Sequence, residues 1–175
     1  IKPKIERKDL FGGEYALNNL SEYLRDDSTR LIVIKGLRRT GKTSLLNVAL
    51  NGLTTNFVKL DVRESPYFER KEFFPYLIEQ IKRKIGSPFL EKIISKISGV
   101  GISYKDLALD LFFSKEENAQ LFFQNLNLQL KKENKTLILA FDEIQLLKAI
   151  KFDYFVASAF DNYGQLKFLI TGSEV

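Results

Sequence analysis

The 175-residue sequence contains no cysteine, no histidine and no methionine, and each absence limits what the chain can do. Without cysteine it has no disulfide bonds and no thiolate metal sites, which fits a reducing compartment and predicts a cytoplasmic protein. Without histidine it has no His-based catalytic triad, zinc site or general base, so its chemistry must use carboxylates, lysine, hydroxyls or backbone amides. Methionine is missing even at position 1, so we expect the natural N-terminus to lie upstream.

Long hydrophobic runs are also missing. No apolar stretch approaches the ~20 residues that a membrane span requires, and no signal-peptide pattern opens the sequence, so we expect no membrane segment. The length predicts one domain, and 45% hydrophobic with 28% charged residues is typical of a globular chain. The net charge of +5 falls mainly in the front half, which is compatible with phosphate or nucleic-acid contacts. Solvated side chains are the favoured interpretation of the basic face at Lys82, Arg83, Lys84, Lys92 and Lys96.

Apolar runs of strand length alternate with helical patterns along the chain. We predict strands over 31–34, 57–62, 136–141 and 167–171. Helical patterns cover 17–24, 45–50, 74–85, 90–97, 119–130 and 152–160. This alternation predicts an α/β fold with a mostly parallel sheet. The continuous apolar run at 31–34 is expected to be buried on both faces, and 107–111 to form a small inserted hairpin.

The strongest motif follows the first predicted strand. Residues 36–43 read Gly-Leu-Arg-Arg-Thr-Gly-Lys-Thr, a complete G-x-x-x-x-G-K-[ST] phosphate-binding loop. Its glycines allow successive N–H groups to face an anion, and the helix that follows adds a positive N-terminal dipole. Lys42 is predicted to reach the β- and γ-phosphates, Thr43 to ligate Mg²⁺, and Ser44 to touch the α-phosphate. A glycine-rich turn without a ligand is the disfavoured alternative, because the motif lies between a strand and a helix.

The loop and its flank supply most of the predicted nucleotide-binding residues. These are Gly36, Leu37, Arg38, Arg39, Thr40, Gly41, Lys42, Thr43 and Ser44. Arg38 and Arg39 occupy variable positions of the motif. They are either solvated, which we favour, or in contact with a partner.

Carboxylates and hydroxyls follow two later strands. Asp142 and Glu143 come directly after an apolar strand, where Asp142 would hold Mg²⁺ opposite Thr43, and Glu143 would accept a proton from the water that attacks the γ-phosphate. Thr171 and Ser173 end the last strand, where each is equally well explained by a contact to water or γ-phosphate and by a strand-end turn. The segment 61–63, Asp-Val-Arg, is left out of the predicted site, because capping or a local ion pair is the favoured role.

Three segments together resemble the predominantly archaeal ATPase family, a STAND-type branch related to AAA+ and origin-recognition ATPases. They read Gly-Leu-Arg-Arg-Thr-Gly-Lys-Thr-Ser-Leu-Leu from 36, Phe-Asp-Glu-Ile-Gln from 141 and Phe-Leu-Ile-Thr-Gly-Ser-Glu from 168. The resemblance spans 9–175 and implies a three-layer P-loop NTPase fold of the additional-strand class. It also implies Walker A at 36–43, Walker B at 137–143 and a sensor 1 strand at 168–173.

The resemblance also bears on both ends of the chain. Family members carry a Phe-x-x-Arg-Glu type box near the adenine pocket, which implies an adenine contact for Phe11, although Gly13 stands where arginine is common. The family continues with a fifth core strand, a helical lid and often a winged helix, all absent from these 175 residues. We therefore expect 1–175 to be one ATPase domain, the N-terminal part of a longer protein.

These features predict an ATP-binding, Mg²⁺-dependent NTPase domain that hydrolyses ATP and acts as a conformational switch on a protein partner. The alternative is a DNA-associated loader or regulator in which ATP is a structural ligand and the missing C-terminal region contacts DNA. A P-loop kinase or transferase is a third class, and these residues do not support an acceptor substrate. The absence of an Asn-Lys-x-Asp string favours ATP over GTP.

Overall fold

The computed structural model describes residues 3–10, 12–64, 69–98 and 115–173. Its strands are β1 (Leu31–Gly36), β2 (Asn56–Asp61), β3 (Leu137–Asp142) and β4 (Leu166–Ser173). Its α-helices are α1 (Glu14–Arg25), α2 (Lys42–Asn51), α3 (Arg70–Ile85), α4 (Ser87–Ser98), α6 (Glu116–Lys132) and α7 (Phe152–Asn162). Short 3-10 helices are η1 (Arg7–Asp9), η2 (Val62–Glu64) and η4 (Ile144–Ile150). The predicted hairpin at 107–111 lies outside the described residues.

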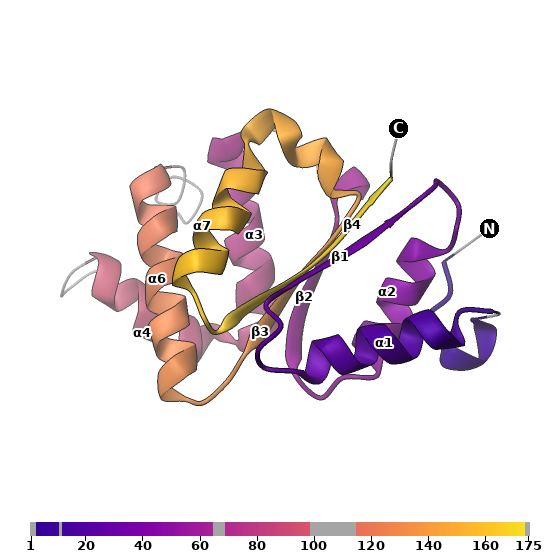
Figure 1. Ribbon diagram of the computed structural model, residues 1–175. Coiled ribbons are helices and arrows are strands. Elements are labelled where there is room, and N and C mark those ends of the chain that lie inside the picture. Colours follow the sequence, from indigo (N-terminus) through magenta and orange to yellow (C-terminus); the bar gives the residue numbers. More distant parts are fainter. Residues whose placement is uncertain (1–2, 11, 65–68, 99–114, 174–175) are drawn as a thin grey trace.

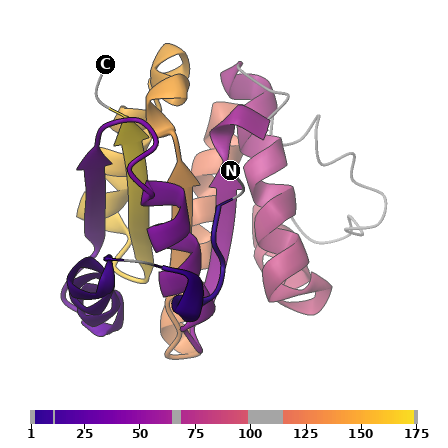
Figure 2. The ribbon, with the colours of Figure 1, turned by 90° about the vertical axis from the view of Figure 1, so that its right-hand side faces the viewer.

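The four strands form one parallel sheet in the order β1-β4-β3-β2. Two helices, α1 and α2, cover one face, and α3, α4, α6 and α7 lie on the other (Figures 1 and 2). Because all the strands are parallel, their carboxyl ends meet at one edge of the sheet. The α/β fold with a parallel sheet that the sequence predicts is confirmed, and the strand–helix alternation places the glycine loop and the acidic and hydroxyl residues that end β3 and β4 at that edge.

Residue alternation along the central strand explains why helices can pack on both faces. In β3, Leu137, Leu139 and Phe141 contact the core under α3, α6 and α7, whereas Ile138 and Ala140 contact the core under α1 and α2. All six residues of β3 are buried. A strand covered on both faces requires such a continuous apolar run.

The helices bury the stripes that their sequence periodicity predicts. In α1 the buried residues Leu17, Leu20 and Leu24 are spaced three and four apart. In α7 Phe152 and Phe155 join an edge-to-face aromatic cluster with Phe73 and Phe74 of α3. This cluster is part of the larger of the two cores, between the sheet and the helices α3, α6 and α7.

The first strand differs from the prediction. We expected 31–34 to be buried on both faces, and this is wrong for one face of β1. Ile32 is buried against α1 and α2, but Leu31 is 37% and Val33 47% exposed. The cause is the position of β1 at the end of the sheet, where the helices on the α7 side do not reach over it (Figure 1). An apolar run alone cannot tell a central strand from such an edge strand.

Candidate nucleotide-binding site

The loop between β1 and α2 has the backbone geometry of an anion-binding turn. Gly41 takes a φ of 90° in the left-handed region, which a side chain would strain, and it is the N-cap of α2. Gly36 is needed for a different reason, because a Cβ there would lie 3.2 Å from Thr40 Oγ1. As Gly41 provides no side-chain cap, the first N–H groups of α2 stay available to an anion.

The ammonium of Lys42 lies inside this loop. Its Nζ donates hydrogen bonds to the carbonyl oxygens of Gly36, at 2.9 Å, and Leu37, at 2.8 Å. The side chain is therefore folded back over the loop, and Lys42 is 8% exposed. A buried cation held at the phosphate loop by two carbonyl oxygens is suited to phosphate oxygens, which would replace those carbonyls as acceptors.

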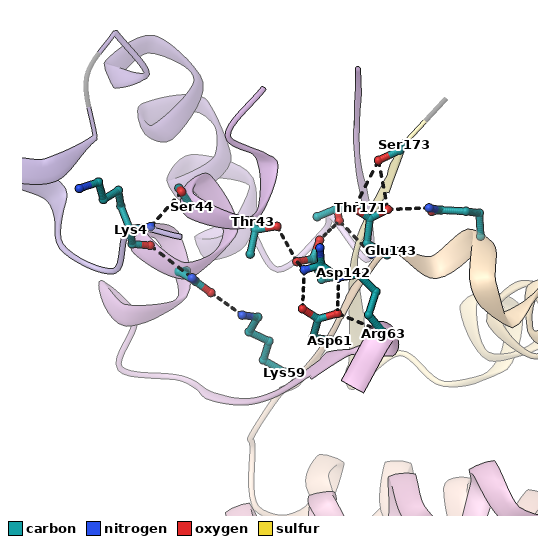
Figure 3. Close-up of polar contacts among 12 residues, drawn as sticks. Lys4, Thr43, Ser44, Lys59, Asp61, Arg63, Asp142, Glu143, Thr171 and Ser173 are labelled. Carbon is teal, nitrogen blue, oxygen red and sulfur yellow. Dashed lines mark hydrogen bonds and ion pairs between the residues drawn. The ribbon is translucent and has the colours of Figure 1, made fainter. Parts of the chain in front are cut away.

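The Thr43 hydroxyl faces the carboxylate at the end of β3. Thr43 Oγ1 donates to Oδ2 of Asp142 at 2.7 Å, so two residues 99 positions apart meet as predicted (Figure 3). Asp142 is fully buried, and Thr171 of the neighbouring β4 donates to its other oxygen, Oδ1. The Thr171 hydroxyl also accepts the N–H of Glu143 at 3.3 Å. Thr171 thus orients both acidic residues, a role that neither sequence interpretation included.

The Glu143 carboxylate is held by two donors. Ser173 Oγ donates to its oxygens at 3.1 and 3.3 Å, and Gln145 Nε2 donates to Oε2 at 2.5 Å (Figure 3). Burial raises the pKa of Glu143, but these hydrogen bonds and the nearby charges of Arg63 and Lys42 outweigh it and leave the pKa below its usual value. Glu143 is therefore a carboxylate at neutral pH, the form that accepts a proton.

The structure brings one pair to the site that sequence analysis left out. Asp61 is the register partner of Asp142 on the adjacent strand β2. Arg63 binds Asp61 through Nε at 2.9 Å and a terminal nitrogen at 2.5 Å, and that nitrogen lies 3.7 Å from Asp142 (Figure 3). Capping or a local ion pair is the role that the sequence favours, and the ion pair is present, but the sequence does not predict its position beside Asp142. One sequence signal could have placed Asp61 in the site: the second and third strands each end in an aspartate, and parallel pairing of these strands would align the two.

The charges of this pair support one another. Burial raises the pKa of Asp61, but the hydrogen bonds and charge of Arg63 outweigh it, so the pKa is lowered overall. The hydrogen bond to Asp61, followed by the charges of Asp61, Asp142 and Glu143, raises the pKa of Arg63 despite its partial burial. Arg63 consequently remains a cation that neutralises part of the negative charge at the strand ends.

The other predicted site residues lie on the rim of the loop. Ser44 Oγ accepts the N–H of Lys4, at 3.0 Å, because residues 3–6 run along α2 (Figure 3). Arg38 and Arg39 are exposed, and Leu37 is 69% exposed, so all three point outward from the loop. Phe11, the predicted adenine contact, lies outside the described residues.

The donor set suits magnesium. Hydroxyl and carboxylate oxygens are the ligands that Mg²⁺ prefers, and Thr43 Oγ1 and Asp142 Oδ2 are close enough to share one ion. Among the residues that the structure describes, no group of three or more acidic side chains forms a complete metal cage. Mg²⁺ is commonly bound by one or two protein oxygens, with water and phosphate completing the octahedron, so this pair fits that mode.

These features define a class. A strand, a glycine loop and a helix suited to an anion, with a carboxylate from another strand of the same sheet facing the loop hydroxyl, make a P-loop ATPase fold. Residues 10–167 match the family described as an ATPase domain predominantly from Archaea, and the chain belongs to that family.

Similar proteins agree with this assignment. The chain is 29% identical over 155 residues to an uncharacterized ATP-binding protein of Methanocaldococcus jannaschii, covering 80% of this chain and 40% of that protein. The solved Walker-type ATPase of Pyrococcus abyssi superposes with a TM-score of 0.63 at 31% identity, over 100% of this chain and 49% of that one.

A second solved structure shares the fold. The Aeropyrum pernix ORC2 protein, solved as ADPNP-ADP complexes, gives a TM-score of 0.61 at 18% identity, over 99% of this chain and 43% of its own. The present chain thus spans less than half the length of these relatives. No helix among the described residues is long and apolar enough to cross a membrane.

Proposed function

We propose that this domain binds ATP with Mg²⁺ at the loop of residues 36–43 and hydrolyses its β–γ bond. The observation that carries the proposal is the 2.7 Å contact between Thr43 and Asp142, which joins the phosphate loop to an acidic strand end. Lys42 would bind the β- and γ-phosphates, and Thr43 and Asp142 would hold the metal. Bound there, Mg²⁺ would neutralise phosphate charge that develops during transfer.

Glu143 is the residue that fits the proton-transfer step. In the proposed reaction a water oxygen bonds to the γ-phosphorus while a Glu143 carboxylate oxygen takes one of its protons. The bond from the γ-phosphorus to the bridging oxygen breaks, and ADP leaves with that electron pair. Glu143 suits this role because its lowered pKa keeps it ionised and because Thr171 and Ser173 fix its backbone and carboxylate.

We further propose that hydrolysis serves as a conformational switch. The phosphate loop follows β1, and Asp142 and Glu143 lie at the end of β3, at the same edge of the four-stranded sheet. A nucleotide bound at this edge would bridge the loop and the acidic residues. Loss of the γ-phosphate would release contacts on that edge and change what a neighbouring segment or protein partner can bind.

Substitution of Lys42 tests nucleotide binding. Lys42→Ala removes the ammonium inside the loop and is expected to weaken Mg·ATP binding at least tenfold, since a charge-assisted phosphate contact contributes about 1.5–3 kcal/mol. Calorimetric titration of both proteins measures this. Lys132→Ala, an exposed lysine at the end of α6, is the matched control and should bind as the wild type does. Equal affinities of Lys42→Ala and wild type would refute the site.

Substitution of Glu143 separates binding from turnover. Glu143→Gln keeps the side-chain shape and removes the proton acceptor, so ATP affinity should be retained while phosphate release falls about a hundredfold or more. Hydrolysis at the wild-type rate would refute the general-base assignment and leave the binding site intact.

The DNA-associated alternative draws less support from the described side chains. Lys82 and Arg83 form ion pairs with Glu79 at 3.2 and 3.6 Å, and Lys84 lies 4.5 Å from the ring centre of Phe57. These contacts use much of the basic face at the end of α3 within the domain. DNA binding that weakens steeply with salt would support the alternative.

A further inference from the structure

Glu143 starts a short 3-10 helix in a conformation that places its side chain next to the second residue of that helix. Its φ of 61° and ψ of 46° lie in the left-handed region, which is unusual for a residue other than glycine. After this turn the chain enters η4, and Gln145 returns to donate to Glu143 Oε2. Strained backbone at such a position persists when surrounding contacts hold it, and Gln145 and Thr171 are two of those contacts.

Room for the Gln145 amide comes from a glycine on the last strand. A Cβ at Gly172 would lie 3.3 Å from Gln145 Oε1, tighter than ordinary van der Waals contact. The absence of a side chain at Gly172 therefore leaves room for the amide oxygen next to β4 while the amide nitrogen donates to Glu143. The hydrogen bond is specific in direction, because a flipped amide would place Oε1 against the carboxylate.

We propose that Gln145 is a positioning residue for Glu143, an inference that rests on the proposed hydrolysis. Ser173 approaches the carboxylate from β4 at 3.1 and 3.3 Å, and Gln145 approaches it from η4 at 2.5 Å. Two donors from different elements fix the rotation of the carboxylate, whereas one shared hydroxyl leaves it free to turn. Within the described residues, no hydrogen bond joins Gln145 to the phosphate loop or to Asp142, so we expect it to act on turnover through Glu143 and to leave ATP binding unchanged.

A packing role is the competing explanation. Gln145 is exposed and also lines a groove of about 540 Å³ between η4, α7 and β1, which Leu31, Phe160 and Ile170 help to form. If Gln145 only fills space there, a side chain of similar length without a donor should replace it. If it positions Glu143, the loss of the N–H donor decides the outcome, and a carboxylate at the same place should be worse than an apolar chain because it repels Glu143.

The test compares Gln145→Met and Gln145→Glu in steady-state ATP hydrolysis. We expect kcat to fall about fivefold for Gln145→Met and by about twentyfold or more for Gln145→Glu, with KM and Mg·ATP affinity within about twofold of wild type. Gln124→Met, an exposed glutamine on α6, is the matched control and should hydrolyse as the wild type does. A wild-type or raised kcat in Gln145→Met would overturn the proposal. A raised KM with an unchanged kcat would also overturn it.

A second variant tests the same contact from the other side. Gly172→Ala should push the amide by a few tenths of an ångström and lower kcat about twofold. In the Gln145→Met background it should have no further effect, because the two changes act through one contact. Independent, multiplying losses would overturn the proposal.

The proposed function and this inference fail in different ways. A wild type that does not hydrolyse ATP, or a Glu143→Gln variant that hydrolyses it normally, would refute the hydrolytic role itself. The side-chain amide of Gln145 still reports on the contact in that case, because its proton resonances in NMR spectra should move when Glu143 is changed to alanine. Resonances that stay in place would overturn the inference without any nucleotide present.

Discussion

Replacing Thr171 by valine removes one hydroxyl from the centre of the site while keeping its shape. Thr171 and Asp142 are both fully buried, and the lost hydroxyl donates to Asp142 Oδ1 and accepts the Glu143 N–H. A hydrogen bond to a charged group contributes about 1.5–3 kcal/mol, and an unsatisfied buried acceptor cannot turn to water. We expect Thr171→Val to lower the free energy of unfolding by about 2 kcal/mol.

Under the proposed function, the same change should also weaken Mg²⁺ binding, because Thr171 orients Asp142. A partner that orients a metal-binding carboxylate typically contributes about 10–100-fold to affinity, so the Mg²⁺ concentration that half-saturates ATP binding should rise about tenfold. Urea unfolding and ATP titrations at several Mg²⁺ concentrations measure the two effects. Thr55→Val, an exposed threonine in the loop before β2, is the control. Stability within about 0.5 kcal/mol of wild type with an unchanged Mg²⁺ dependence would refute the reasoning.

Two further predictions concern the opposite end of the sheet. Lys167 of β4 is 2% exposed, and its Nζ donates to the carbonyls of Tyr23, Leu24 and Asp26 at the end of α1, so Lys167→Met should lower the free energy of unfolding by about 3 kcal/mol. Lys35→Met, at an exposed position of β1, should change the free energy of unfolding little, and equal effects of the two substitutions would contradict the prediction. Hydrogen bonds from Thr29 and Ser28 lower the pKa of Asp26 to about 2 from 3.8, so its stabilising contribution is complete above about pH 4 and lost as pH falls through 2. Asp26→Asn should therefore destabilise the domain in urea unfolding much more at pH 7 than at pH 2, and a pH-independent loss would exclude this cause.

Most of the sheet and the loop could be predicted because their signals are local. A glycine loop between a strand and a helix has one geometry, and Asp142 after an apolar strand must end near it if the strands are parallel. The burial of β1 could not be predicted in the same way. Whether a strand lies in the centre or at the end of a sheet depends on its neighbours, and the apolar run at 31–34 is the same in both cases.

The sequence predicted which residues belong to the site more easily than which contacts those residues make with one another. Thr171 and Ser173 were both candidates for water or phosphate, and as residues i and i+2 of β4 they share one face of the sheet. Their different depths along the strand separate their roles, because Thr171 is buried against Asp142 and Ser173 reaches Glu143. Arg63 and Gln145 depend on the path of the chain after β2 and β3. Short 3-10 turns there return each side chain to a neighbouring carboxylate, and such turns leave little pattern in a sequence.

Charge balance connects these separate contacts. Asp61, Asp142 and Glu143 share one end of the sheet, and Arg63 already lies 3.7 Å from the Asp142 oxygen that faces Thr43. A divalent cation at that oxygen would be repelled by the Arg63 guanidinium, whereas a triphosphate beside Lys42 adds negative charge that attracts both cations. We therefore expect Arg63 to weaken the binding of Mg²⁺ alone and to favour the binding of Mg²⁺ together with the triphosphate. Under the proposed function, the arginine between two aspartates therefore predicts that Mg²⁺ binds only together with ATP, as a nucleotide-driven switch would require.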